Sequence, residues 1–317
     1  MSEFNQRLKM AREMSWQHFG KKIVFYLPGM FVQNGVSGKY PAISITGNEC
    51  ALMCDHCQGK LLTSMIQAPA PEKLIDMCLT LDAKGNNGVL LSGGCDVSGH
   101  LPWDRFIPAI KEIKQRTNLF ISIHSGLMDE KEALGLKQAG VDQALIDIIG
   151  DDETFQRMYH VPFGVERILD TMACLERASL PVVPHIVCGL NYGIIQGESQ
   201  AIEMIADFKV EQLVIVSLMS IPGTPACRAI APPAETVTDI IAQARIKMPT
   251  TLISLGCARR RGDYSLETLA IDAGVNRMAL PSDEAIARAK HYDLEIHYQK
   301  TCCSVTRDLF GSPWGAE

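Results

Sequence analysis

Three cysteines stand close together early in the chain, at Cys50, Cys54 and Cys57. They follow a short apolar run, so we expect them on a tight loop after the first strand. Three thiolates at this spacing can converge on one metal centre. A four-iron cluster has one iron at each corner, so three cysteines bind three irons and leave the fourth open to another ligand. The spacing therefore indicates an iron–sulfur cluster with one reactive iron.

A structural zinc site and ordinary burial are the alternatives for this cysteine triad. Structural zinc almost always takes four ligands, usually supplied as two pairs. Here only His56, inside the loop, could complete the set. Free cysteines are often small buried hydrophobes, but such residues have no reason to gather on one loop. The iron–sulfur cluster is the better interpretation.

The elements that must position this loop follow the pattern of an α/β barrel. Short apolar, β-branched runs alternate with amphipathic stretches of about ten to fifteen residues, which is typical of repeated βα units and a parallel sheet. We predict the α/β class, as a (βα)8 TIM-type barrel with a short N-terminal extension and a cysteine-bearing C-terminal tail. The expected strands are residues 42–46, 88–92, 119–124, 143–148, 182–188, 212–218, 251–255 and 276–280. The expected helices are residues 71–82, 103–117, 129–138, 164–177, 198–208, 235–246, 265–272 and 283–290.

The two flanks are too short to be domains of their own. Residues 1–41 read as an N-terminal extension, with a helix at 5–18 and an apolar run at 23–27, packed against the barrel. The barrel takes residues 42–293, and a C-terminal tail of residues 294–317 carries a strand-like stretch at 294–298. In such barrels the active site lies at the C-terminal ends of the strands.

Composition excludes several classes of function. The net charge is −6 and no long Lys/Arg run occurs, so a nucleic acid is not expected as a partner. The charged N-terminus is unlike a signal peptide, and no apolar stretch reaches the roughly 18 residues that span a bilayer. We therefore expect a cytoplasmic protein without membrane contact. Its eleven cysteines should be mostly reduced there, which favours metal ligation over disulfides.

The cysteine spacing, on the first strand-to-helix loop of an expected barrel, resembles the signature of the radical S-adenosylmethionine (SAM) superfamily. The resemblance implies that Cys50, Cys54 and Cys57 hold a [4Fe–4S] cluster whose open iron is chelated by SAM. An electron from the cluster would cleave SAM to methionine and a 5′-deoxyadenosyl radical. His56 occupies the position before the third cysteine, where the family often places an aromatic residue beside adenine.

Other strand ends supply candidate SAM-binding residues. The second strand ends in Ser92, Gly93, Gly94 and Cys95. The family binds the amino group of SAM at this position. Because Cys95 stands in place of the usual Glu, the contact with the amino group is left to backbone carbonyls and Ser92. Asp147 and Asp151 follow the fourth strand and could bind ribose or substrate, or cap a helix. Ser217 and Gly223, near the sixth strand, resemble the Gly-Thr-Pro turn of biotin-synthase-like members.

A second group of cysteines consists of Cys257, just past the seventh strand, and the adjacent pair Cys302 and Cys303 in the tail. Because the tail could fold back over the barrel mouth, we hypothesise an auxiliary iron–sulfur cluster bound by these three. The alternative is a solvent-exposed, disordered tail. Cys78 and Cys174 lie in amphipathic helices and read as core. Further cysteines near strand ends that could add a ligand are Cys95, Cys188 and Cys227.

Within the biotin-synthase-like branch, the cysteine loop with Lys60, the Ser-Gly-Gly-Cys turn and the late cysteines look like a subunit of two-component lipoyl synthases. That likeness implies sulfur insertion into an octanoyl chain on a lipoyl-domain or H-protein-type carrier, with the auxiliary cluster as sulfur donor. It also implies a homologous partner subunit and a reductant such as ferredoxin or flavodoxin. The arginines at 259–261 could anchor an acidic carrier or the SAM carboxylate, or form a solvated turn.

Two other functions stay open from the sequence. One is a radical SAM enzyme of different chemistry, such as rearrangement or metallocofactor assembly in the manner of the hydrogenase maturases. The other is a non-enzymatic iron–sulfur protein, which would need four protein ligands and no barrel mouth.

Overall fold

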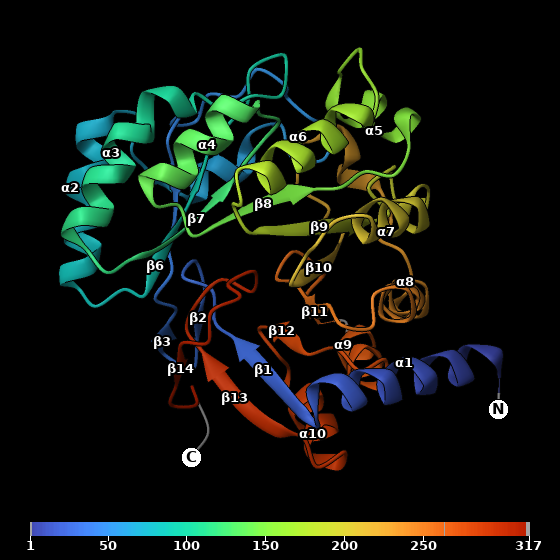
Figure 1. Cartoon of the computed structure of the whole chain (residues 1–317). Helices are drawn as coiled ribbons and strands as arrows, with labels where there is room; N and C mark the ends of the chain where they lie inside the picture. The colour runs from blue at the N-terminus through green and yellow to red at the C-terminus, as the bar shows by residue number, and fades with distance from the viewer. Residues whose placement is uncertain (1, 263, 315–317) are drawn as a thin grey trace.

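The computed structural model describes residues 2–262 and 264–314, and its main feature is one curled sheet with helices on its outside (Figure 1). All of the strands expected from the sequence are present, and they lie side by side in chain order. Each pairs in parallel with the next, as expected for βα units buried on both faces. The α/β barrel-type fold is therefore confirmed. These strands are β4 (Ala42–Ser44), β6 (Gly88–Ser92), β7 (Phe120–His124), β8 (Gln143–Asp147), β9 (Val182–Cys188), β10 (Gln212–Ser217), β11 (Leu252–Leu255) and β12 (Arg277–Ala279).

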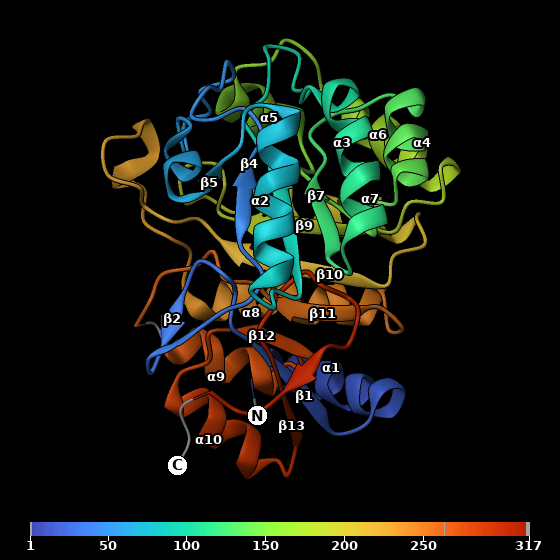
Figure 2. The same ribbon diagram turned by 90° about the vertical axis from the view of Figure 1, so that its left-hand side faces the viewer.

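The helices between these strands cover the outer face of the sheet, and Figure 2 shows α2, α3 and α4 next to one another there. One further helix, α5, was not expected; it lies between β8 and α6. The helices are α1 (Glu3–Phe19), α2 (Pro71–Ala83), α3 (Trp103–Arg116), α4 (Glu130–Ala139), α5 (Asp152–Tyr159), α6 (Glu166–Arg177), α7 (Glu198–Ala206), α8 (Ala234–Lys247), α9 (Tyr264–Asp272) and α10 (Asp283–His291), with short 3-10 turns at Lys60–Ser64 and Pro225–Arg228.

The sheet curls without closing into a ring of eight strands. The free edge of β12 pairs with β1 (Lys22–Tyr26), and β1 pairs in turn with β13 (Glu295–Gln299). At the other end β4 pairs with the short β5 (Ile66–Gln67). The apolar run at 23–27 and the strand-like tail are thus part of the sheet rather than packed against it. The physical reason is that all but the first residue of β1 is buried, which a surface strand could not satisfy.

Three short strands, β14, β2 and β3, form antiparallel pairs. β14 (Phe310–Gly311) adds an antiparallel edge next to β13. β2 (Val32–Gln33) and β3 (Val36–Ser37) form a separate antiparallel pair between β1 and β4.

The inside of the curled sheet is filled by the chain's own C-terminal segment, residues 301–306, which we call the C-terminal plug. Cys303 and Val305 of the plug are 3% and 0% exposed. They belong to one cluster with inward-facing apolar side chains of the strands and with Tyr40, which lies just before β4. Those side chains are Val24, Tyr26, Tyr40, Ala42, Leu90, Phe120, Leu145, Val183, Val214, Val216 and Ala279.

Polar side chains on the inner face of the sheet bind the backbone of the plug. Gln143 donates from Nε2 to the carbonyl oxygen of Ser304 at 2.9 Å, and Gln212 donates from Nε2 to that of Cys303 at 2.8 Å. Buried polar groups need such partners, and the plug provides them in place of water. Further donors to carbonyls of the plug are Tyr26, Ser254 and Arg277. The plug therefore fixes the place of Cys302 and Cys303.

Candidate active site

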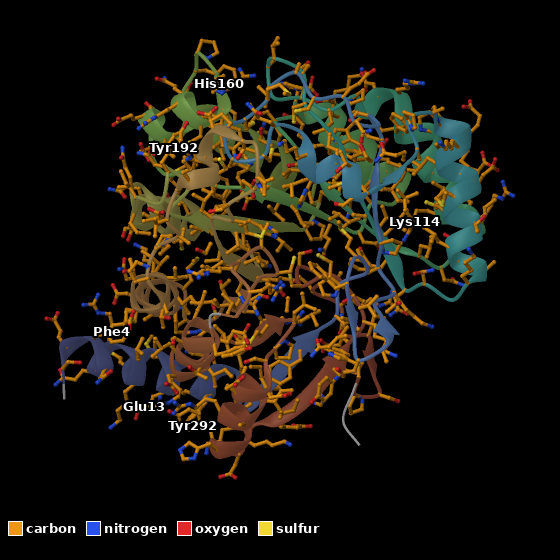
Figure 3. The ribbon with its side chains drawn as sticks, turned by 180° about the vertical axis from the view of Figure 1, so that it is seen from behind. Phe4, Glu13, Lys114, His160, Tyr192 and Tyr292 are labelled. Atoms are coloured by element: carbon orange, nitrogen blue, oxygen red, sulfur yellow. The ribbon has the colours of Figure 1, made fainter. Side chains whose placement is uncertain are left out.

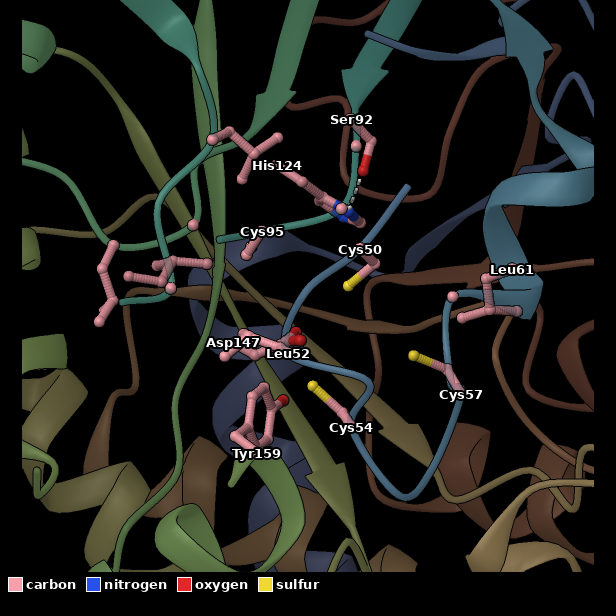
Figure 4. Close-up of a pocket in the computed structure, with 18 of the residues that line it drawn as sticks. Cys50, Leu52, Cys54, Cys57, Leu61, Ser92, Cys95, His124, Asp147 and Tyr159 are labelled. Carbon is pink, nitrogen blue, oxygen red and sulfur yellow. Dashed lines mark hydrogen bonds between the residues drawn. The ribbon is translucent and has the colours of Figure 1, made fainter. Parts of the chain in front are cut away.

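The loop that follows β4 places three sulfur atoms around one space, and Figure 4 shows those of Cys50, Cys54 and Cys57 pointing into it. The loop turns tightly, because the N–H groups of Cys57 and Gln58 both donate to the carbonyl oxygen of Cys54, at 3.0 and 2.8 Å. Gln58 and Gly59 follow with left-handed backbones, at φ 45° and 69°. The reversal brings the third cysteine back toward the first two.

The electrostatics of the loop favour a thiolate. A hydrogen bond from Cys54, together with one from His56, lowers the pKa of Cys57 to about 4 although burial opposes the shift. The same bond to Cys57, and burial, raise the pKa of Cys54. Burial acts to lower the pKa of His56, but the hydrogen bond to Cys57 and the charge of Cys57 outweigh burial and raise it. Thiolates are the metal-binding form of cysteine, so the loop is prepared to bind iron.

A cavity of about 260 Å³ opens beside these sulfurs at the C-terminal ends of β4, β6, β7 and β8. Its remaining wall is mostly apolar, with side chains from α5 and from the loops that follow β6 and β7. The predicted site residues that line it are Cys50, Cys54, His56, Cys57, Ser92, Gly93, Gly94, Cys95 and Asp147. The structure thus brings the cysteine triad together with the Ser-Gly-Gly-Cys turn.

The cavity fits a bound cluster and a polar organic ligand. A Cβ added at Gly94 would lie only 2.1 Å from the carbonyl oxygen of Glu49 and 2.4 Å from the Cβ of Cys50, so only glycine lets the two loops approach. Among the described residues, Nδ1 of His56 and the hydroxyl of Tyr159 are buried without a hydrogen-bond partner. Both residues line the cavity, and a ligand with polar groups would satisfy these atoms.

Phe155 and Tyr159 form part of the cavity wall, and sequence reasoning missed both. They lie on α5, which is short and rich in polar residues. The ring of Tyr159 packs against that of His56, with centroids 5.4 Å apart. Asp151 could have indicated this helix, because the sequence allowed it either to bind ribose or substrate or to cap a helix. Its Oδ1 accepts from the N–H of Thr154 at 2.9 Å, so it caps α5.

A layer of polar side chains forms where β6, β7, β8 and β9 run side by side. Ser92 Oγ lies 3.3 Å from Nδ1 of His124, and the ring of His124 meets that of His185 edge to face at 6.1 Å. Asp147 is paired in register with His185. Burial lowers the pKa of His124 and lowers that of His185 to about 4, while Asp147 opposes both shifts. Both imidazoles are therefore neutral near pH 7, and neither was identified from the sequence.

The low pKa of His185 should make stability depend on pH. The unfolded side chain titrates near 6.5 and the folded one near 4, so between these values the unfolded chain binds the extra proton. The free energy of unfolding should therefore fall as the pH falls from 6.5 to 4, by about 1.4 kcal/mol per pH unit for one fully coupled proton. We expect denaturant unfolding of His185→Gln to show a shallower loss than the parent chain. Equal slopes in the two proteins would contradict the buried neutral imidazole.

Two predicted SAM-site residues do not line the cavity. Ser217 is buried at the end of β10, where its N–H donates to the carbonyl oxygen of Ala258 at 3.0 Å. Gly223 lies in a turn with φ 74°. The turn does approach the cysteine loop, because Nζ of Lys60 donates to the carbonyl oxygen of Pro222 at 2.6 Å.

The late cysteines Cys257, Cys302 and Cys303 meet inside the curled sheet. Hydrogen bonds to Cys303 lower the pKa of Cys257 and lower that of Cys302 to about 6, against the opposing effect of burial. Hydrogen bonds to Cys257 and Cys302 raise the pKa of Cys303. Cys303 thus lies within hydrogen-bonding range of both Cys257 and Cys302, which come from two separate parts of the chain.

The position of this second group differs from the expected one. The tail does not fold over the barrel mouth as a cover; it enters the curled sheet as the C-terminal plug. Arg259 is also not a surface anchor, because it is 1% exposed and donates from Nη2 to Oε1 of Glu267 at 2.7 Å. A buried ion pair of this kind holds the loop after β11 in place. Arg260 and Arg261 are exposed.

Within residues 2–262 and 264–314, no three His, Cys, Asp or Glu side chains are arranged to hold a single metal ion. Cysteines that each bind a different iron of a cluster need not meet that arrangement.

In the same described part of the chain, no helix combines the length and the apolar character needed to cross a membrane.

Comparison with known proteins adds the family. The model of the Radical SAM superfamily matches residues 44–208. Among curated relatives, the chain is 24% identical over 243 residues to a biotin synthase of Leptothrix cholodnii, covering 74% of this chain and 69% of the relative. A biotin synthase of Burkholderia thailandensis is 28% identical over 249 residues, with 74% and 71% covered.

Solved structures show the same fold at low sequence identity. Methylornithine synthase (PylB) superposes with a TM-score of 0.63 at 18% identity, over 98% of this chain and 84% of the other. HydG, a maturase of the [FeFe]-hydrogenase, superposes with a TM-score of 0.65 at 15% identity, over 93% and 69%. These likenesses confirm the curled barrel-type fold.

Proposed function

The chain belongs to the radical SAM superfamily, and on this premise we propose that it inserts sulfur into an unactivated C–H bond of a protein-bound octanoyl chain. Family membership makes it an enzyme that uses a [4Fe–4S] cluster with SAM. The biotin synthases among its relatives support sulfur insertion as the type of chemistry.

In this proposal Cys50, Cys54 and Cys57 hold the SAM-binding cluster. When bound, that cluster supplies the electron that cleaves SAM into methionine and the 5′-deoxyadenosyl radical, which abstracts hydrogen from the substrate. Gly94 lets its loop pack closely against Cys50, and His56 and Tyr159 offer SAM their unpartnered polar atoms. The apolar walls around the cavity exclude water from the radical.

The observation that carries sulfur insertion is the contact among Cys257, Cys302 and Cys303. Hydrogen bonds to Cys303 lower the pKa of Cys257 and of Cys302, which favours the thiolate form that binds metal. We assign them to an auxiliary iron–sulfur cluster that is consumed as the sulfur donor. The plug holds two of these ligands inside the barrel, where a carbon radical formed in the cavity could be trapped.

The cavity wall supports an alkyl substrate. The apolar side chains that line it can surround a straight acyl chain. They include Leu101, Leu127, Ile149, Phe155, Val161 and Ile168.

The remaining partners follow from the same proposal. The octanoyl chain would arrive on a lipoyl-domain or H-protein-type carrier, and the exposed Arg260 and Arg261 could attract an acidic one. A homologous partner subunit would add the other sulfur, and ferredoxin or flavodoxin would supply electrons. We place the enzyme and these partners in the cytoplasm.

Product analysis tests this function. The anaerobic, reconstituted chain receives an octanoyl-lysine peptide, SAM and a strong reductant, with and without a homologous partner. We expect 5′-deoxyadenosine and methionine together with a thiolated peptide, detected by mass spectrometry. Cleavage of SAM with no sulfur on the peptide would reject the sulfur-insertion proposal and leave the family chemistry standing.

One observation favours a second candidate, a radical SAM enzyme that acts on a polar small molecule. His124, Asp147 and His185 place hydrogen-bonding groups beside the cavity, where an alkyl chain would offer them no partner. Rearrangement or metallocofactor assembly would use such groups. Activity on a polar substrate that survives loss of the second cysteine group would support this candidate.

A further inference from the structure

Asp55 is a buried carboxylate between two residues of the cysteine triad, and both of its oxygens are engaged. It is 8% exposed. Its Oδ1 lies 2.9 Å from Nε2 of His160, and its Oδ2 accepts a short hydrogen bond from the hydroxyl of Tyr192. A carboxylate is buried only when it is paired or hydrogen-bonded, so these two contacts explain its position.

The backbone of Asp55 is bound as well. Its N–H donates to the carbonyl oxygen of Met158 at 2.9 Å, and its carbonyl oxygen accepts from the N–H of Ala226 at 3.1 Å. Asp55 therefore ties the cysteine loop to three other segments: the C-terminal end of α5, the loop after β9, and the 3-10 turn at Pro225–Arg228. No other role is visible for a carboxylate at this position, because it does not line the cavity.

The two side chains that bind Asp55 both come from left-handed backbone. His160 has φ 58° and Tyr192 has φ 52°, and neither is a glycine. Such conformations cost free energy and persist where the surroundings impose them. Tyr192 is held further by Arg157, whose guanidinium lies 4.6 Å from the ring centroid. Figure 3 shows His160 and Tyr192 at the same end of the molecule.

We propose that Asp55 is a positioning residue for reductive cleavage of SAM. Its hydrogen bonds hold Cys54 and Cys57 at a fixed distance from the segments that form the opposite wall of the SAM cavity. α5 carries Phe155 and Tyr159 on that wall. With Asp55 in place, the cluster ligands and this wall keep one fixed spacing. The proposal concerns SAM cleavage and does not depend on what the radical attacks afterwards.

The first test uses the metal-free chain, where no cluster can mask the effect. Asp55→Ala removes the two side-chain hydrogen bonds that join the cysteine loop to His160 and Tyr192. We expect hydrogen exchange of the backbone amides at 54–60 and 189–193 to quicken together, by about tenfold or more. The strands of the sheet should keep their protection.

Asp142→Ala is the matched control. Asp142 also uses its carboxylate for two hydrogen bonds, accepting from Nζ of Lys114 at 2.8 Å and from the N–H of Ile121 at 2.7 Å. It lies at the N-terminal end of β8, and Figure 3 shows Lys114 on the opposite side from His160 and Tyr192. This variant should loosen neither loop. Exchange that rises equally in both variants, or in neither, would overturn the proposal.

The second test uses the reconstituted enzyme and separates positioning from general damage. For Asp55→Ala we expect iron to bind, but the affinity for SAM to fall about tenfold and the electron paramagnetic resonance signal of the reduced cluster to respond differently to SAM. Asp55→Asn keeps the shape and can still bond both neighbours, so it should restore most of the affinity. SAM affinity and spectra unchanged from the parent in Asp55→Ala would contradict the proposal.

Discussion

Cys54→Ala should abolish reductive cleavage of SAM and empty the first iron site. Cys54 is 5% exposed, and its sulfur points into the same space as those of Cys50 and Cys57 (Figure 4). Without it only two cysteines remain, which is too few to hold a four-iron cluster that also binds SAM. Loss of a residue that only orients a ligand costs up to about a hundredfold in metal affinity, so loss of the ligand itself should cost more. The measurements are iron content after reconstitution and 5′-deoxyadenosine formed under a strong reductant.

Cys78→Ala is the control for this prediction. Cys78 is fully buried in α2, away from the cavity, and burial raises its pKa to about 12. It is thus a small core side chain, and its loss should lower the free energy of unfolding by about 1 kcal/mol. SAM cleavage should be retained. Cleavage that survives in Cys54→Ala, or fails equally in both variants, would contradict the assignment of the ligands.

Replacing Cys257, Cys302 and Cys303 together with alanine should separate SAM cleavage from sulfur transfer. The first cluster and the cavity do not use these residues, so SAM cleavage should continue at a rate within about twofold of the parent, as for independent sites. Iron content should fall to about four per chain, that of one four-iron centre. Sulfur transfer to an octanoyl peptide should be lost entirely.

Cys227→Ala provides the matched control, because Cys227 is a partly buried cysteine in the 3-10 turn at Pro225–Arg228 that neither lines the cavity nor belongs to the cluster around Cys303. This variant should keep the iron of the auxiliary cluster, and it should still transfer sulfur to the peptide. Retained SAM cleavage in the triple variant shows that the barrel is folded, so a loss of transfer can be read as chemistry. Full transfer without the three cysteines would favour the candidate that acts on a polar small molecule.

The strands of this fold could be predicted because they are short apolar runs that alternate with amphipathic helices. The runs that became β6, β7 and β10 are buried along nearly their whole length, which a parallel sheet covered on both faces requires. The cysteine loop could be predicted for a similar reason, since its spacing is local. A pattern whose residues lie close together in the sequence can be interpreted without knowing the fold.

The C-terminal plug could not be predicted, because it is held by contacts between distant parts of the sequence, such as those of Gln143 and Gln212, which lie 161 and 91 positions from their partners. One signal was available. Gln143, Gln212 and Arg277 are polar residues at the starts of otherwise apolar strands, and buried polar groups need partners. The sequence shows that a partner is required without showing which segment provides it.

The polar layer beside the cavity was missed for a different reason. His124 and His185 lie within expected strands, and the two-residue period of a strand allows either face. Only the observed pairing of β7, β8 and β9 turns both imidazoles toward Asp147. α5 was missed because eight residues, of which five are polar or charged, give little helical periodicity.

The central claim is that sulfur reaches the substrate from the group held by Cys257, Cys302 and Cys303. The most direct measurement reconstitutes the chain with heavy-isotope sulfide and runs a single turnover on an octanoyl-lysine peptide with unlabelled sulfide in solution. The proposal predicts that the thiolated peptide carries the heavy isotope and that the protein loses sulfide in equal amount. A product with only light sulfur, or SAM cleavage with no sulfur in the product, would contradict it.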